Sequence, residues 1–425
     1  MISCPSLWTD LRCNDLEKTL VYLQRSGSSA PVNVSLSGYW DICSGDPFFQ
    51  VIPRVTGRLK SLSIDVMPDC IDDIAASLSS PEPLLEKLEI TIDTGEMEDE
   101  PPELPSLFAD DLSSLHDLIL RHVHTDLPWR DMANLTTFKL WMDPPDVITI
   151  TQLLDFFEAA PRLREIELTY ATPTFDGRKD RLVSLTNLKK MTVKGCDPCA
   201  PLLGHLLIPI DAKLEILSES EFLRYEDLIP ESLDNLGNLS NFATASLHFY
   251  SSGSSVQFSG PSGELSMVLE GSGSTSHLSM ALDYMARFGL STVEKLRIIG
   301  DGNLDVRAVH RALPPMQGLR TLTLFGWENQ CALIETLSPH QDASSAVICP
   351  KLEELAFRPH KNGEKSVIQC LIGVATSRAL RGVGFKNVKI FGARGRFDSE
   401  DVLELGKYVP HVEYDVGTSR IWGPL

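Results

Sequence analysis

The chain has 425 residues, of which 43% are hydrophobic and 23% charged, a composition typical of a globular protein with ample material for a core. Its formal net charge of −20 argues against a general affinity for nucleic-acid phosphates or for an anionic membrane surface. No run of about 20 apolar residues occurs, and the N-terminus lacks the order of a signal peptide, so we expect a protein that is neither exported nor membrane-spanning. Nine scattered cysteines, an odd number, favour reduced thiols in the cytoplasm or nucleus.

Hydrophobic spacing and turn residues predict alternating helices and strands along the chain. The predicted elements are, in order, a helix over 15–25, a strand over 32–36, a covering segment over 48–55, a strand from Leu59, a helix over 69–78, a strand from Leu85, helices over 151–160, 280–289, 305–313 and 399–408, and a closing strand over 412–416. Residues 94–104 are acidic and contain proline, which predicts a solvated loop. The repeating unit is therefore a helix, a short loop and a strand.

One spacing, L-x-x-L-x-L, returns along most of the chain at intervals of roughly 20 to 33 residues. Clear copies begin at Leu59, Leu85, Leu115, Leu163 and Leu319, and looser copies at Leu135, Leu188, Val293, Leu352 and Leu380. Apolar residues two apart face one side of a strand, so stacked copies bury a shared core beneath a parallel sheet. The pattern predicts an α/β fold, an irregular leucine-rich-repeat solenoid (a horseshoe) with a parallel sheet and outer helices.

Two features predict departures from a regular array. The segment over 242–270 contains three alternating stretches, 244–250, 255–259 and 264–270, separated by serine- and glycine-rich turns. These predict an antiparallel β-meander inserted in the solenoid at about 242–275, or replacing one of its turns. The asparagine or cysteine that usually follows the spacing is present only as Cys196, which predicts long outer loops.

Five stretches carry a resemblance to a known family. They are Cys4–Leu11 (C-P-S-L-W-T-D-L), Leu20–Ser26, Ala30–Leu36, Arg58–Leu62 and Pro83–Leu88. The chain resembles fungal F-box proteins with leucine-rich-like repeats, in which a C-P-S-L-W-T-x-L stretch follows the last F-box helix. The resemblance implies that residues 1–11 are a remnant after a missing or truncated F-box and that 12–425 form a single solenoid domain.

Metal-ligand spacings occur twice, each with a simpler explanation. Cys196 and Cys199 have the spacing of a zinc half-site, but no second pair follows, which favours a turn in which one cysteine is the turn residue. His122 and His124 could form a metal-binding edge on a strand, although a solvated loop at a repeat end is the favoured interpretation. We therefore predict no metal site.

Two stretches of the sequence bear some likeness to catalytic or phosphate-binding motifs. Glu165 and Glu167 have the look of an acid/base pair, but both fall on the outer face of one strand, where Lys190 would be their cross-strand partner. The glycine-rich stretch 271–275 lacks the lysine of a phosphate-binding loop, and no hydrolase, metalloprotease or kinase signature occurs. We predict no catalytic residues and no cofactor, and thus no enzyme.

Function is then expected on the concave face of the sheet, at the variable positions of the repeats. The candidate partner-binding residues are Lys87, Glu89, Asp117, Lys139, Glu165, Glu167, Lys190, Lys295, Arg297 and Glu354. The partner would be an unknown protein, with no nucleic acid and no membrane. The resemblance implies the substrate-recognition region of an F-box-type receptor of a cullin ubiquitin ligase, which would bind a Skp1-type adaptor only if an F-box exists upstream. The alternatives are a free-standing leucine-rich-repeat scaffold with no ubiquitin role and, more remotely, an enzyme with an unrecognised site.

Overall fold

The computed structural model describes residues 4–13, 15–37, 47–93, 103–104, 107–110, 112–125, 132–142, 148–174, 181–220, 225–239, 241–250, 253–261, 263–270, 281–282, 288, 290–302, 304–339, 347–358, 364–391 and 399–416. The protein is mixed α/β, and parallel strands dominate its main sheet. Contacts divide the chain into two compact units. The first unit comprises Met1–Pro209 and Ile229–Leu236, and the second comprises Ile210–Leu228 and Gly237–Leu425.

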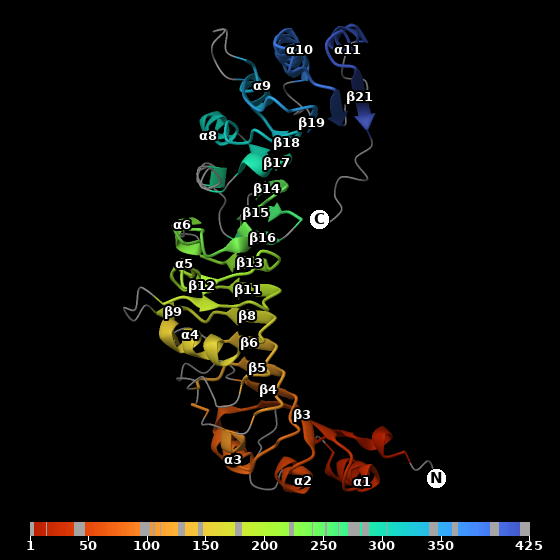
Figure 1. Ribbon diagram of the computed structural model, residues 1–425. Coiled ribbons are helices and arrows are strands. Elements are labelled where there is room, and N and C mark those ends of the chain that lie inside the picture. Colours follow the sequence, from red (N-terminus) through yellow and green to blue (C-terminus); the bar gives the residue numbers. More distant parts are fainter. Residues whose placement is uncertain are drawn as a thin grey trace. The chain divides into compact units, whose positions relative to one another are not determined.

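Eight parallel strands form the sheet of the first unit (Figure 1). They are β1 (Asp10–Arg12), β2 (Val32–Ser37), β3 (Leu59–Val66), β4 (Lys87–Ile92), β5 (Asp117–Arg121), β6 (Thr137–Trp141), β8 (Glu165–Thr169) and β11 (Lys190–Lys194), each paired with the next. The second leucine positions of the repeated spacing stand in register across this sheet, at Leu62, Leu88, Leu118, Phe138, Ile166 and Met191. All six side chains are fully buried, which confirms the predicted parallel sheet and the register of these copies.

Helices and short strand pairs complete the described part of the first unit. The helices are η1 (Pro5–Trp8), α1 (Leu16–Ser26), α2 (Pro47–Val55), η2 (Pro68–Cys70), α3 (Ile71–Ser77), η3 (Phe108–Asp110), α4 (Ile150–Ala159) and α5 (Ala200–Leu203). Two short parallel pairs of strands accompany them. In the first, β7 (Ile148–Thr149) pairs with β9 (Pro173–Thr174), and in the second, β10 (Val183–Ser184) pairs with β12 (Leu206–Leu207). Helices α3, α4 and α5 lie on one side of the strands (Figure 1). A capping box between Thr149 and Gln152 begins α4, and Leu153 and Phe157 on its inner face are buried. The predicted helices over 15–25, 69–78 and 151–160 are confirmed.

The same pair of backbone hydrogen bonds recurs at the start of several strands. The Glu86 carbonyl oxygen accepts hydrogen bonds from the amides of His116 and Asp117, at 2.8 and 3.0 Å. The carbonyl oxygen of His116 repeats this arrangement with the next strand, and in the second unit so do those of Glu294, Arg320 and Glu353. A shared backbone arrangement therefore underlies copies whose sequences differ.

Nine strands form the sheet of the second unit. In paired order they are β13 (Lys213–Ser218), β16 (Glu264–Glu270), β15 (Gly253–Ser259), β14 (Thr244–Tyr250), β17 (Lys295–Gly302), β18 (Thr321–Trp327), β19 (Glu354–Arg358), β20 (Asn387–Phe391) and β21 (His411–Val416). Strand β15 is antiparallel to both β14 and β16, whereas β16 is parallel to β13 and β14 is parallel to β17. The predicted meander is therefore confirmed. Its three strands are inserted into the sheet in reversed order.

Helices α6 (Tyr225–Leu228), η4 (Gly237–Leu239), η5 (Leu290–Thr292), α8 (Val306–Ala312), α9 (Gln330–Glu335), α10 (Glu364–Leu380) and α11 (Ser399–Leu405) complete the second unit. Helix α10 packs against α9 and α11. The predicted helices over 305–313 and 399–408 are confirmed. The predicted helix over 280–289 and the predicted loop over 94–104 lie almost wholly outside the described residues. Within the described parts of the chain, none of the helices has the length and apolar composition that crossing a membrane requires.

The predicted copy starting at Leu380 is wrong in register. Leu380 ends α10 and is 82% exposed, whereas the buried frame is Phe385, Val388 and Ile390, with Val388 opposite Leu355. The buried residues of α10 lie on one face of the helix, but that face includes Arg378 and the other positions include glycine and alanine, so the sequence shows no clear division into an apolar and a polar side. Leu380, five residues before Phe385, has the look of the first leucine of a repeat.

A side-chain donor closes the turn after two of the strands. The Cys196 thiol donates to the carbonyl oxygens of Leu168 and Lys194, at 3.5 and 3.3 Å, which confirms the cysteine as the turn residue. Trp327 occupies the same position of its own repeat, where the sequence predicted a departure. Its fully buried indole N–H donates to the carbonyl oxygen of Ile298 at 3.4 Å, so a different side chain satisfies the equivalent backbone group.

Candidate interaction surface

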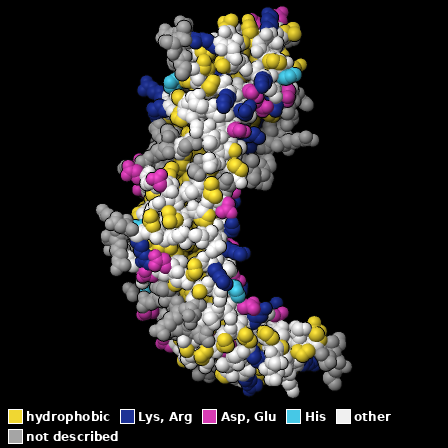
Figure 2. Space-filling model, viewed as in Figure 1, with side chains coloured by type: hydrophobic (Ala, Val, Ile, Leu, Met, Phe, Trp, Pro, Cys, Tyr) yellow, Lys and Arg dark blue, Asp and Glu magenta, His cyan; other side chains and the backbone are white. Residues whose placement is uncertain are grey.

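The outer face of the first unit's sheet carries two rows of aligned side chains, here called the polar face. The first row is Ser61, Lys87, Asp117, Thr137, Glu165 and Lys190, and the second is Ser63, Glu89, Ile119, Lys139, Glu167 and Thr192. Seven of the ten predicted partner-binding residues lie in these rows. Lysine, arginine, aspartate and glutamate side chains are interspersed on the side of this unit away from its helices (Figure 2).

Lys139 is the centre of one charged group on the polar face. Its ammonium lies 2.9 Å from Glu165 and 3.1 Å from Glu167, on the neighbouring strand β8. The hydrogen bond to Glu165 raises the pKa of Lys139 against the opposing effect of burial, and Glu167 adds to the increase. Lys190, the predicted cross-strand partner of these carboxylates, lies opposite Glu165 in the register, and Lys139 pairs with both carboxylates from the other side.

Glu89 is the centre of a second charged group. Its carboxylate contacts the Lys87 ammonium at 3.0 Å and the Arg121 guanidinium at 2.6 Å. Burial opposes ionisation of Glu89, but the hydrogen bonds from Arg121 and Lys87 outweigh it and lower the pKa of the carboxyl group. Arg121 also contacts the Thr91 hydroxyl at 3.3 Å, and the sequence analysis did not include it among the candidates.

These ion pairs organise the face more than they stabilise the fold. Partly exposed pairs contribute about 0–1 kcal/mol each, because water and salt screen the charges. Fixed charges of both signs have more influence on binding specificity, because they favour a surface with the complementary charge pattern and disfavour a mismatched one. The polar face is thus suited to specificity.

An aromatic row, His122, Trp141 and Tyr170, borders the polar face at the carboxyl ends of β5, β6 and β8. The Trp141 ring lies 5.7 Å from the His122 ring and 6.5 Å from the Tyr170 ring, between ring centres. The Lys194 ammonium lies over Tyr170, 6.0 Å from the ring centre. Trp141 is 37% exposed, which is a large apolar surface for a residue on a sheet of paired charges.

Backbone geometry holds two members of the aromatic row in place. His122 and Tyr170 have left-handed backbone angles, with φ of 56° and 54°, and their amides donate to the carbonyl oxygens of Trp141 and Lys194 at 2.7 Å. Gly195 has the same conformation one strand further, with φ of 60°. A residue other than glycine pays about 1–2 kcal/mol for this conformation. The two aromatic residues therefore occupy strained turn positions. Residues with strained backbone angles are found more often at binding sites than elsewhere.

Sequence reasoning missed Trp141 and Tyr170 and considered His122 only as part of a metal edge. A signal for Trp141 was present, because it directly follows the third apolar position of its copy, where the side chain points to the outer face. The described residues contain no cluster of three or more potential metal ligands. Burial raises the pKa of the Cys196 thiol to about 12, so that this group remains protonated in its turn.

The other three candidates lie in the second unit. Lys295 and Arg297 are on β17, facing Thr321 and Thr323 of β18, and Glu354 on β19 contacts Lys389 at 3.1 Å. On the same face, the hydroxyl of Ser246 lies 2.8 Å from Nε2 of His248. Burial and then the charge of Arg297 lower the pKa of His248.

No protein-family model matches the chain, and a search of curated proteins finds no significant match.

Proposed function

We propose that this chain is a protein–protein interaction module and that it binds its partner through the polar face and the aromatic row of the first unit. The observation that carries the proposal is the aromatic row. Tryptophan, tyrosine and arginine dominate the binding energy of protein interfaces, and the strongest sites combine an exposed aromatic anchor with a surrounding polar rim. His122, Trp141 and Tyr170 supply the anchor, and the paired charges around Glu89 and Lys139 supply the rim.

The fold that presents this surface is, in our proposal, an irregular leucine-rich-repeat solenoid. Three recurring features support it: buried apolar rows in register, doubly accepting carbonyl oxygens before the strands, and a left-handed residue two positions after the third apolar residue. That residue is His122, Tyr170, Gly195 or Gly326 in four of the copies. A solenoid of this kind exposes one side of its sheet as an extended binding surface.

The biological role we propose is the substrate-recognition region of an F-box-type receptor of a cullin ubiquitin ligase. The support is the sequence resemblance, which includes the stretch Cys4–Leu11. This stretch packs into the first unit, since Leu11 is 1% exposed and the rings of Trp8 and Tyr22 lie 5.1 Å apart. The alternative is a free-standing leucine-rich-repeat scaffold with the same binding surface and no ubiquitin role.

Co-expression with a Skp1-type adaptor separates these two roles. The chain is expressed as it stands and, in parallel, with any upstream reading frame attached. A receptor captures the adaptor in the form that carries an F-box, whereas a scaffold captures it in neither form. The second result would end the ubiquitin proposal and leave the interaction surface untouched.

Site-specific photo-crosslinking tests the surface itself. A benzophenone amino acid is placed at Trp141 and, as a matched control, at Leu403, a residue of α11 that is 70% exposed. The proposal expects a crosslinked protein that is specific to position 141 and is competed away by the unlabelled chain. Identical crosslinks from both positions would contradict a binding role for the aromatic row.

A further inference from the structure

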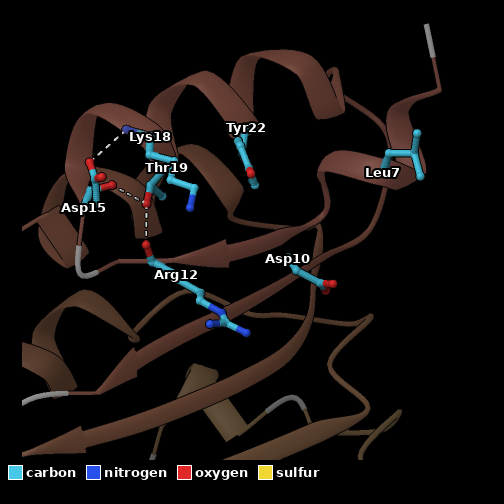
Figure 3. Close-up of a pocket in the computed structure, with 7 residues that line it drawn as sticks. All are labelled: Leu7, Asp10, Arg12, Asp15, Lys18, Thr19 and Tyr22. Carbon is cyan, nitrogen blue, oxygen red and sulfur yellow. Dashed lines mark hydrogen bonds between the residues drawn. The ribbon is translucent and has the colours of Figure 1, made fainter. Parts of the chain in front are cut away.

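A pocket of about 490 Å³ lies between α1 and β1 in the first unit (Figure 3). Its lining residues are Leu7, Asp10, Arg12, Asp15, Lys18, Thr19 and Tyr22. The volume falls within the range of about 300–1,000 Å³ typical of ligand-binding pockets. The pocket involves none of the residues of the polar face or aromatic row, so its function is a separate question.

Hydrogen bonds fix the walls of this pocket. The Thr19 hydroxyl bridges the carbonyl oxygens of Arg12 at 2.5 Å and Asp15 at 2.7 Å, which ties the strand to the helix. Asp15 caps α1 by accepting from the Lys18 amide at 3.1 Å. Thr19 itself is buried, with 2% of its surface exposed. The pocket is thus built before any ligand arrives.

The charges within the pocket are unequally engaged. Asp10 accepts a hydrogen bond from the Asn33 side-chain amide at 2.7 Å, and Asp15 is occupied as the helix cap. Arg12 and Lys18 form no ion pair with any of the described residues, and the Lys18 ammonium contacts the Tyr22 ring at 5.7 Å. Lys18 and Tyr22 point from α1 toward β1, where Arg12 lies (Figure 3). Lys18 and Tyr22 from α1 and Arg12 from β1 thus line the same pocket.

The backbone of β1 adds a second feature. The Thr9 carbonyl and the Cys13 amide bond to β2, so the main-chain groups of Asp10 and Arg12 point to the opposite edge of the strand. Thr19 occupies the Arg12 carbonyl, and Asp10, whose main-chain groups point to the same edge, is one of the residues that line the pocket. An extended peptide can pair with an open strand edge of this kind.

We propose that this pocket binds an acidic residue of an extended peptide, with the carboxylate or phosphomonoester of its side chain held by Arg12 and Lys18. A guanidinium matches both groups with two parallel hydrogen bonds, and the lysine supplies a second charge. The Tyr22 ring packs against the stem of the acidic side chain, and the Asp10 edge binds the peptide backbone. The site is independent of the surface proposed above.

Fluorescence polarisation on the full chain tests the site with three labelled hexapeptide pools. Their central residue pair is Glu-Glu, phosphoserine-Glu or Gln-Gln, and the flanking positions are random. Binding is expected for the two acidic pools, and Arg12→Gln and Lys18→Gln each weaken it by about tenfold or more, the usual loss for a charged hydrogen bond. The matched control is Lys407→Gln, an exposed lysine after α11, which leaves binding unchanged.

Four results would overturn the proposal. The glutamine pool binding as tightly as the acidic pools would remove the charge argument. Unchanged binding by folded Arg12→Gln and Lys18→Gln, with folding checked by circular dichroism, would place the peptide elsewhere. Free glutarate or inorganic phosphate binding as tightly as the acidic pools would show a small-acid site rather than a peptide site. Hydrogen exchange with the phosphoserine pool bound should slow at 5–26, and protection confined to other segments would also refute the location.

Discussion

Arg378 of α10 offers the sharpest test of how the second unit is held together. Its side chain is fully buried, and its guanidinium donates to the carbonyl oxygens of Leu337 at 3.2 Å, Ile348 at 3.0 Å and Cys349 at 2.9 Å. The same group lies over the Phe385 ring, 5.1 Å from its centre. Replacing Arg378 by methionine keeps an apolar stem of similar reach and removes all three donors.

The expected magnitude follows from two opposing effects. A hydrogen bond to a charged group contributes about 1.5–3 kcal/mol, so three of them contribute about 5–9 kcal/mol. Burial lowers the pKa of Arg378 from 12.5 to about 10, which corresponds to about 3 kcal/mol of cost for keeping the group charged. The hydrogen bonds prevail. Arg378→Met should therefore lower the free energy of unfolding by about 2–6 kcal/mol.

Urea unfolding monitored by circular dichroism measures this change, with Arg358→Met as the matched control. Arg358 is exposed on β19, and its backbone carbonyl oxygen, which the substitution retains, accepts a hydrogen bond from the Gln330 side-chain amide. The control should stay within about 0.5 kcal/mol of the wild type. A loss below about 1 kcal/mol for Arg378→Met would show that the three carbonyl oxygens find other donors, and would refute the reasoning.

Three further predictions concern the first unit. The buried carboxylate of Glu82 accepts a hydrogen bond from the Gly57 amide at 2.8 Å. Glu82→Ala should lower the free energy of unfolding, measured in urea, by about 1–3 kcal/mol. Glu82→Gln keeps an acceptor and should lower it clearly less. The lowered pKa of Glu89 means that its ion pairs stabilise the fold above its ordinary value of 4.5 and lose this effect as the pH falls through the lower folded value. Glu89→Gln should therefore flatten the loss of stability below pH 4.5, and an unchanged pH profile would contradict the assignment. An alanine Cβ at Gly195, where φ is 60°, would collide with the Tyr170 ring; Gly195→Ala should lower the melting temperature, with a cost of about 1–2 kcal/mol, and displace that ring.

The spacing of leucines was sufficient to predict the parallel sheet and its buried rows, because in-register burial depends only on residues within each copy. It was insufficient where a copy lacks its first leucine or where its helix lacks a clearly polar side. Strand β13, with Leu214 and Ile216, was missed for the first reason, because Asp211 stands at the leucine position, and α10 was missed for the second.

The proposed binding surface was only half predictable for a different reason. The charges of the polar face could be predicted because each occupies an outward position of a recognisable strand. The aromatic row depends on strands that are distant in sequence, and on left-handed turns at His122 and Tyr170 that no local pattern announced. Similarly, the hydrogen bond of Trp327 to Ile298 is a property of two neighbouring repeats, so the sequence of either repeat alone does not contain it.

The most direct test of the central claim is a quantitative capture experiment with the aromatic anchor removed. The purified wild-type chain, Trp141→Ala and the control Leu380→Ala, whose side chain is 82% exposed, are immobilised and incubated with an extract of the source cells. Bound proteins are then measured by mass spectrometry. The account predicts a reproducible set of proteins that Leu380→Ala retains and that Trp141→Ala loses by about tenfold or more, as for an interface hot spot. If Trp141→Ala captures everything that the wild type captures, the aromatic row is not the anchor of a binding surface and the account is contradicted.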